Sequence, residues 1–179
     1  GRPVDRKAHM LSGYIDAANF IDGASATPRM SSLASALICL DCGVEPVLQM
    51  TARDRTRITI QADALGASAL GIRNILCISG DHPKLGPAPM AVLEPLDVDS
   101  IQMLWILRRM RDEGRLLDGR TLKTPPRYFL GAAASPYASN PRFEALRMEK
   151  KINAGAQFFQ SQPIYDFDTF ERWLEELDK

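Results

Sequence analysis

The chain has 179 residues, of which 45% are hydrophobic and 25% are charged, the balance of a folded globular protein. Its 22 basic and 22 acidic side chains cancel, which excludes the positive excess of a nucleic-acid-binding protein. No apolar run approaches the ~20 residues of a membrane span, so we predict no membrane partner and expect a cytoplasmic location. The length predicts a single domain over residues 1–179, and the abrupt start GRPVDRKAH is compatible with an interior start.

Short apolar segments alternate with amphipathic segments along the whole chain. We expect strands at 14–20, 46–50, 74–79, 127–134 and 157–162. We expect helices at 29–43, 54–70, 97–113, 140–155 and 167–179, the second of them capped by Asp54. The Gly- and Pro-rich loop that starts at Gly80 is long for a connection from strand to helix, which marks it as a candidate functional segment.

Apolar residues mark the face that two of these helices are expected to turn toward a sheet. Spacings of three and four residues place such side chains on one side of an α-helix, where they can be buried together. In the helix at 54–70, the apolar stripe comprises Ile58, Ala62, Leu65 and Ala69. In the helix at 97–113, it comprises Ile101, Leu104, Trp105 and Leu107.

A helix, a glycine and then a strand follow one another at Gly43, Gly71 and Gly155. Repeated junctions of this kind indicate a parallel sheet covered by helices. A (β/α)₈ TIM barrel takes roughly 250 residues, so the sequence predicts an incomplete α/β barrel of TIM type with about five βα units. An open doubly wound sheet is the alternative, although neither G-x-G-x-x-G nor G-x-x-x-x-G-K-[ST] occurs in the sequence.

Polar residues follow each expected strand, at the carboxyl ends where either architecture places its chemistry. The set contains amides, aspartates and backbone groups but no nucleophile–base pair, which suits the binding of a flat cofactor that forms hydrogen bonds. No cluster has the spacing of metal ligands, so we predict no metal site. The residues at these ends are Asn19, Asp22, Gln49–Thr51, Ser79–Asp81, Ala134–Pro136 and Gln160–Gln162.

Taken singly, these residues have ordinary structural explanations. A Gly80-Asp81 pair after a strand is routinely a turn, and Gln49 or Gln162 can simply finish a buried strand. Lys150 and Lys151 lie late in a helix, where they suit the negative end of the helix dipole. A functional assignment for any of them therefore needs further support.

The three cysteines are predicted to be packing residues. Their odd, low number argues against a disulfide framework. Cys39 and Cys42 form a C-x-x-C motif, but they fall near the expected end of a helix, where the helix dipole disfavours a thiolate. A zinc site would need further ligands, for which the sequence offers only Cys77, His9 and His82.

Four segments taken together resemble the methylenetetrahydrofolate reductase family. Their order and spacing match from about Asp16 to the end of the chain. The short bacterial form found in acetogens, with its LQMT-RDR segment, is resembled most. The segments are EPVLQMTARDRTR at 45–57, ALGIRNILCISGDHP at 69–83, GAAASP at 131–136 and EKKINAGAQFFQSQPIYD at 149–166.

This resemblance implies a flavoprotein built on a TIM barrel. Such an enzyme reduces 5,10-methylenetetrahydrofolate to 5-methyltetrahydrofolate through reduced flavin, in one-carbon metabolism and methionine biosynthesis. FAD is the implied cofactor, with FMN as the alternative. The implied partners are the folate substrate, an electron donor that is NAD(P)H or a reduced electron-carrier protein, and a second copy or a partner subunit.

The resemblance also implies roles for individual residues. Asp81 matches the aspartate beside flavin and folate, where a carboxylate disfavours an anionic reduced flavin and stabilises a cationic iminium substrate. Gln162 matches the glutamine that binds the folate pterin, and Tyr165 lies in the folate-side loop. The implied cofactor-binding residues are Gln49, Ser79, Gly80, Ala132, Ser135, Lys150 and Lys151.

The sequence departs from the family pattern at several positions. Many members have His at the position of Gln49, Arg at Ser79 and a tyrosine at Ser135. The catalytic glutamate of an E-x-x-P-P-like motif is not found in these 179 residues, so we expect a fragment of the enzyme that is inactive alone. The alternatives are a non-catalytic barrel subunit and a pterin-binding methyltransferase domain.

Overall fold

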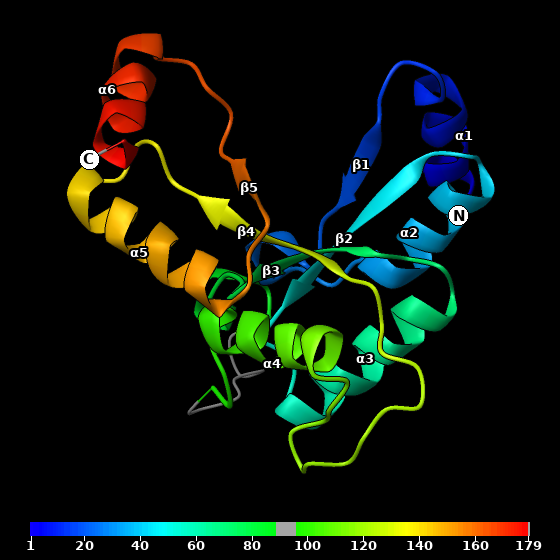
Figure 1. The fold of residues 1–179 in the computed structure, drawn as a ribbon. Coiled ribbons are helices and arrows are strands. Elements are labelled where there is room, and N and C mark those ends of the chain that lie inside the picture. The colour runs from blue at the N-terminus through cyan, green and yellow to red at the C-terminus, as the bar shows by residue number, and fades with distance from the viewer. Residues whose placement is uncertain (89–95, 179) are drawn as a thin grey trace.

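The computed structural model describes residues 1–88 and 96–178, which form one layer of strands covered by helices (Figure 1). All strand pairs in this described part are parallel, and the strands are ordered β1-β2-β3-β4-β5 as in the sequence. A doubly wound sheet reverses its strand order at a switch point, whereas a barrel adds each strand beside the last. The strands are Ala17–Phe20 (β1), Glu45–Thr51 (β2), Asn74–Ile78 (β3), Phe129–Ala134 (β4) and Phe158–Ser161 (β5).

The sheet is therefore a half-barrel, as the predicted incomplete TIM barrel requires. Figure 1 shows β1 and β5 standing apart at the two ends of the curved sheet, with the α-helices between successive strands on its outer side. The α-helices are Arg2–Leu11 (α1), Ser32–Asp41 (α2), Arg57–Ala69 (α3), Ser100–Asp112 (α4), Pro141–Ala154 (α5) and Phe167–Leu177 (α6), and short 3₁₀ turns lie at Ala24–Ala26 (η1) and Pro83–Leu85 (η2).

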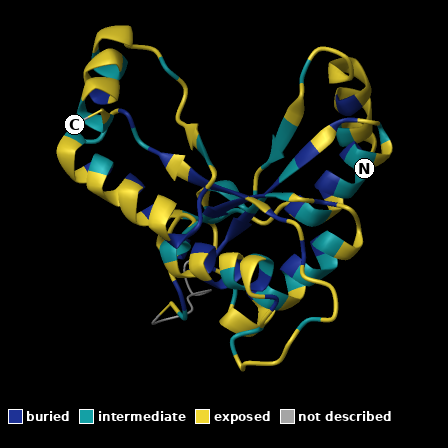
Figure 2. Ribbon diagram, in the orientation of Figure 1, coloured by how far each residue is buried: buried dark blue, intermediate teal, exposed yellow. Residues whose placement is uncertain are grey.

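The main core lies between the outer face of the sheet and the helices (Figure 2). Alternate strand residues, such as Leu48 and Met50 of β2 and Ile75 and Cys77 of β3, are at most 2% exposed and belong to this cluster. Because side chains alternate across a strand, the residues between them face the inner side of the sheet. The inner face and the strand ends, which this core does not fill, are therefore the places where the chain can contact a ligand.

The predicted glycine junctions are confirmed. Gly43 and Gly71 follow α2 and α3 with φ of +77° and +86°, a left-handed conformation that glycine adopts without a steric penalty. Gly155 is the C-cap of α5, with φ of +121°. Each junction stops a helix and turns the chain into the next strand.

The predicted apolar stripe of α3 is wrong. Ile58 is 75% exposed, and Ile60, Ala64 and Ala67 form the buried face instead. Thr56, not Asp54, caps this helix by accepting a hydrogen bond from the Thr59 amide. Both stripes have helical spacing, so the sequence pattern alone did not distinguish them.

Two further differences concern the buried face of α4 and the helix α1. Leu104 and Leu107 of the predicted stripe of α4 are buried as expected, but Trp105 is 47% exposed and Ile106 is buried, so the core-facing side of α4 is rotated from the expected one. Helix α1 was not predicted, because its sequence RPVDRKAHML carries few apolar residues. Among the described residues, no helix is both long enough and apolar enough to cross a membrane.

Candidate active site

The end of β2 and the loop after β1 are joined by a hydrogen-bonded network. Gln49 accepts a hydrogen bond at Oε1 from the amide of Asp22 at 2.9 Å. Asp22 in turn accepts at Oδ2 from the amide and hydroxyl of Thr51, both at 3.0 Å, and from Arg55 at 2.6 Å. The side chain of Gln49 therefore orders the first loop of the site. Sequence reasoning placed Asp22 at a strand end but assigned it no role.

Arg53 lies buried beneath this loop. Its guanidinium donates to the carbonyl of Gly23 at 3.0 Å and to that of Asp81 at 3.3 Å, and it pairs with Asp54. The hydrogen bond to Asp54 is the main reason that the pKa of Arg53 is raised, so the side chain stays charged. Arg53 thus links the loops that follow β1 and β3. It was missed because an arginine after a strand is usually a surface residue.

Asp81 connects the same two loops through its side chain. Its Oδ2 accepts a hydrogen bond from the Ser25 amide at 2.6 Å, and the residue is exposed. Ser25 and Ala26 have φ of 56° and 50°, a left-handed conformation that is uncommon for residues other than glycine. The carboxylate is therefore more than a turn former, because it holds a strained segment of another loop.

Gly80 is required by its surroundings. Its φ is +88°, and a Cβ at this position would lie 3.1 Å from the side chains of both Thr51 and Arg53. The close approach of β2 therefore explains this glycine without a ligand. Its predicted contact with a flavin ring stays a prediction.

A second group of predicted residues lies at the ends of β4 and β5. Lys151 of α5 is buried and donates from Nζ to the carbonyl of Ala133 at 2.7 Å, with Glu144 3.7 Å away. Glu144, also buried, accepts a hydrogen bond from the amide of Ser135 at 3.3 Å. Burial lowers the pKa of Lys151, and Glu144 opposes that effect. Lys150, next in the helix, is exposed, so the structure does not bring the two lysines to the strand end together.

The predicted folate-side residues lie in the loop after β5. Gln162 and Tyr165 are exposed, the latter at 86%. Tyr137, from the loop after β4, accepts hydrogen bonds at its hydroxyl from the amides of Tyr165 and Asp166 at 2.8 and 3.1 Å. Tyr137 was missed, although it stands only two residues after Ser135. It joins the last two loops of the site, as Arg53 joins the first two.

Two predicted cofactor contacts differ in what they can offer a ligand. Ala132 is 1% exposed and belongs to the core on the helix side, so its side chain cannot line the inner face. Ser79 is half-buried, and its carbonyl accepts the Arg53 amide at 2.9 Å. On the inner face, Asn19 has a buried Oδ1 that finds no hydrogen-bond partner in the described part of the chain.

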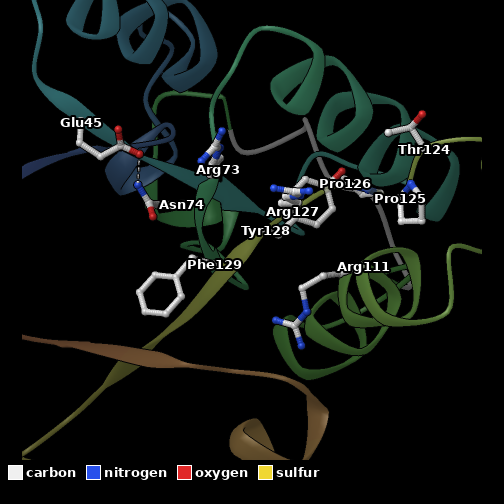
Figure 3. Close-up of a pocket in the computed structure, with 10 residues that line it drawn as sticks. All are labelled: Glu45, Arg73, Asn74, Arg111, Thr124, Pro125, Pro126, Arg127, Tyr128 and Phe129. Atoms are coloured by element: carbon white, nitrogen blue, oxygen red, sulfur yellow. Dashed lines mark hydrogen bonds between the residues drawn. The ribbon is translucent and has the colours of Figure 1, made fainter.

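A larger hollow lies at the opposite ends of the strands. Figure 3 shows it beside the starts of β2, β3 and β4, where Glu45, Asn74 and Phe129 line it. Its volume is about 860 Å³, whereas the hollow beside Asp22 and Arg53 measures about 280 Å³. Chemistry in parallel α/β barrels belongs at the carboxyl ends. We therefore place the candidate site at the carboxyl ends of the strands, beside the smaller hollow, although Asp81, Gln162 and Tyr165 do not line that hollow.

Comparison with known proteins identifies the family. The profile described as methylenetetrahydrofolate reductase matches residues 3–179. The chain belongs to the methylenetetrahydrofolate reductase family. A Caenorhabditis elegans protein described as "Probable methylenetetrahydrofolate reductase (NADPH)" is 29% identical over 176 residues. That match covers 96% of this chain and 23% of the relative, so the chain spans about a quarter of the relative's length.

Family membership confirms the resemblance noted in the sequence, and a solved structure supports the fold. A protein from Clostridium thermocellum, described as binding two copies of 5-methyl-5,6,7,8-tetrahydrofolic acid, superimposes with a TM-score of 0.60. The match covers 98% of this chain and 53% of that protein, at 13% identity. At this identity the likeness concerns the fold, and the methylenetetrahydrofolate reductase family is established by the sequence match.

Proposed function

We propose that this chain is the flavin- and folate-binding part of an enzyme that reduces 5,10-methylenetetrahydrofolate to 5-methyltetrahydrofolate. Family membership supports the reaction, and the folate described for the Clostridium protein supports the substrate class. The observation that carries the proposal is Asp81, a carboxylate at a strand end with one oxygen held by the Ser25 amide. The curated relative is much longer, so the activity of the whole protein belongs to this proposal.

The inner face offers groups that fit the edge of a flavin ring. Asn19 lies on the inner side of β1, in register with Val47, and its buried Oδ1 is an acceptor without a partner in the described residues. An unpaired buried acceptor is costly, so a ligand donor at this position would be favourable. We propose FAD, with FMN as the alternative, and NAD(P)H or a reduced electron-carrier protein as the donor. When bound, the flavin supplies the hydride.

In the proposed mechanism, the residues of this chain bind and orient the substrate and stabilise its charge. The Asp81 carboxylate faces the substrate when its methylene carbon carries an iminium charge, and opposite charges attract strongly where water is excluded. Ser25 and Arg53 keep Asp81 in place through its side chain and its carbonyl. Gln162 and Tyr165 hold the folate from the last loop, which Tyr137 orders.

The first prediction tests Asp81 in the full-length protein. Asp81→Asn keeps the side-chain size but removes the charge, so we expect folate reduction to slow by roughly 100-fold or more. Stopped-flow spectroscopy should show that the donor still reduces the flavin at the wild-type rate, while reoxidation by the folate becomes slow. Asp118→Asn, a neutralisation in a surface turn, is the matched control. Folate reduction at the wild-type rate in Asp81→Asn would remove Asp81 from the mechanism.

Two alternatives remain outcomes of the same measurements. We propose that the 179-residue chain does not catalyse the reaction by itself. We further propose that the whole protein is cytoplasmic and that it acts as a homo-oligomer or with a partner subunit. A full-length protein that binds flavin but never reduces folate would favour a non-catalytic barrel subunit. A full-length protein without any flavin absorbance would favour a pterin-binding methyltransferase domain.

A further inference from the structure

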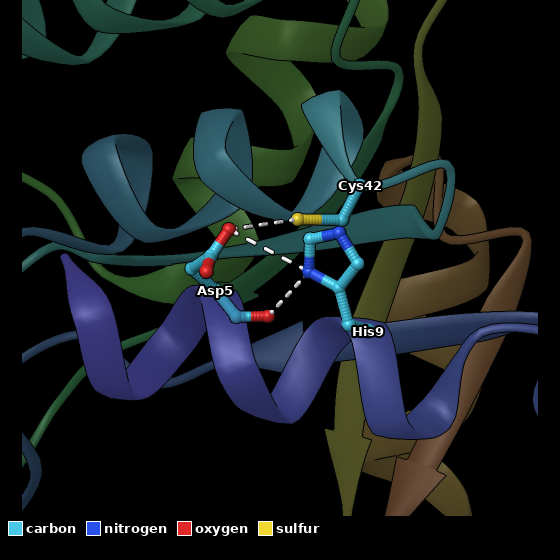
Figure 4. Close-up of side chains that lie close together, drawn as sticks. All are labelled: Asp5, His9 and Cys42. Atoms are coloured by element: carbon cyan, nitrogen blue, oxygen red, sulfur yellow. Dashed lines mark hydrogen bonds and ion pairs between the residues drawn. The ribbon is translucent and has the colours of Figure 1, made fainter.

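Three side chains with metal-binding atoms meet between α1 and α2, away from the candidate active site. Asp5 and His9 are four residues apart on α1 and therefore share one face of that helix. Cys42, the C-cap of α2, faces them (Figure 4). One ligand atom from each of the three residues lies within 4.8 Å of the other two.

The distances in this cluster are close to those of a tetrahedral metal site. Asp5 Oδ1 lies 3.6 Å from Cys42 Sγ and 3.6 Å from His9 Nδ1. Two ligands of a tetrahedral zinc ion lie roughly 3.3–3.6 Å apart, given the usual zinc–sulfur, zinc–nitrogen and zinc–oxygen bond lengths. Asp5 and His9 are exposed and Cys42 is half-buried, and all three ligand atoms lie within 4.8 Å of one another, so rotation of these side chains would bring them around one ion.

The hollow that contains the cluster carries charges of both signs, because Arg2 and the Gly1 amino terminus line it together with Asp5 and Asp41. Asp41 lies in the same hollow as the cluster, and the C-terminal end of α2 carries the negative end of its helix dipole. Burial, the hydrogen bond to Asp5 and the negative charges of Asp5 and Asp41 raise the pKa of the Cys42 thiol. The same negative charges that disfavour a free thiolate would attract a divalent metal.

The packing of the helices holds the ligands in place. Ala8 of α1 is buried against Cys39 and Val44, and the buried thiol of Cys39 donates to the carbonyl of Val44. Cys39 is therefore a packing residue, as predicted, while Cys42 of the same C-x-x-C motif turns the other way. The sequence did not reveal this group because two of its members lie on the unpredicted helix α1.

We propose that Asp5, His9 and Cys42 form a binding site for a borderline-soft divalent metal ion of the zinc class, with water or Asp41 as the fourth ligand. Thiolate, imidazole and carboxylate together are ligands typical of zinc. On binding, the thiol proton leaves to solvent as the sulfur–metal bond forms. The His9 ring, whose Nδ1 now contacts the Asp5 carbonyl at 3.0 Å, moves its proton to Nε2 through solvent and binds the metal with the freed Nδ1 lone pair.

Cobalt(II) is the probe for this site, used with tag-free, chelator-washed protein. We expect saturable binding of one ion, a near-ultraviolet charge-transfer band from the thiolate and the intense visible bands of tetrahedral cobalt, all removed by added zinc. Cys42→Ser should abolish the charge-transfer band, and His9→Ala should weaken binding at least about tenfold. His82→Ala and Cys77→Ala, the matched histidine and thiol controls, should bind cobalt like the wild type.

The spectrum of the unmodified protein decides the proposal even if a variant fails to fold. A wild-type spectrum without the thiolate band would overturn it, as would cobalt binding that is unchanged in Cys42→Ser. Zinc should also raise the thermal midpoint of the wild type and leave that of the folded Cys42→Ser variant unchanged. Neither result depends on folate or flavin chemistry, so this proposal and the proposed function can fail separately.

Discussion

At the scale of single residues, the site is organised by side chains that tie one loop to another. Arg53 bonds the carbonyls of Gly23 and Asp81, and Tyr137 bonds the amides of Tyr165 and Asp166. Charged or aromatic groups in such places order the loops before a ligand arrives, which lowers the entropic cost of binding. Their conformations matter as much as the residues that contact the ligand.

Gly80 should be intolerant of substitution for two separable reasons. Gly80→Ala imposes a left-handed conformation on alanine, which costs about 1 kcal/mol, and pushes a methyl group against Thr51 and Arg53. We expect a total loss of about 2–3 kcal/mol in the free energy of unfolding, measured by urea denaturation. Gly119→Ala is the control, because Gly119 has the same φ of +88° and no described atom within 4 Å of its Cβ position. Equal losses in the two variants would refute the packing argument.

The buried pair of Lys151 and Glu144 should respond differently to single and double substitutions. Lys151→Met leaves the Glu144 carboxylate buried without its cation, for which we expect a loss of about 3 kcal/mol in denaturant unfolding. Lys150→Met, at the exposed neighbouring position, should change stability by less than about 0.5 kcal/mol. Adding Glu144→Gln to Lys151→Met should restore part of the loss. A double variant no more stable than Lys151→Met would show that the pair does not interact.

At the scale of elements, α3 shows how a helix can offer two apolar stripes. Ile58, Ala62 and Leu65 have helical spacing, but so do Ile60, Ala64 and Ala67, which are fully buried. Ile60, Ala64 and Ala67 belong to the main core, so the choice between the two stripes depends on the entry angle of the chain. That angle follows from Thr56, whose side chain caps the helix.

This choice of face is testable with two isoleucines in the same helix. Ile60→Ala removes a side chain that is 0% exposed, and we expect a loss of about 2–5 kcal/mol in the free energy of unfolding. Ile58→Ala, at 75% exposure, should change it by less than about 0.5 kcal/mol. Equilibrium urea unfolding of both variants provides the comparison. A larger loss in Ile58→Ala would restore the face predicted from the sequence.

At the scale of the whole molecule, the half-barrel leaves part of its inner face open. Phe129 is 44% exposed and stacks on Phe158, with 5.1 Å between ring centroids, and the Phe158 ring lies over Gly131. The strands at the two ends of the sheet, β1 and β5, each pair with one neighbour in the described structure. Exposed aromatic surface and unpaired strand edges both favour association.

We therefore expect the 179-residue chain to self-associate as its concentration rises. Phe129→Asp places a charge on the inner face and should shift the sedimentation distribution toward the monomer, with a loss of about 1 kcal/mol from the aromatic pair. Phe143→Asp, at a 58% exposed position on α5, should leave the distribution unchanged. Equal sedimentation of the wild type and Phe129→Asp would show that the inner face does not drive association.

The sequence alone determined the alternation of strands and helices, the glycine junctions and the family, because these depend on local conformation and on ordered motifs. Asp81 and Gln49 were also found at the expected strand ends, and Lys151 was found late in its expected helix. Tertiary structure decided the buried face of α3, the roles of Arg53 and Tyr137, and the meeting of Asp5 with Cys42. Each of these depends on contacts between residues far apart in the chain, and local spacing carries no information about the angle at which two elements meet.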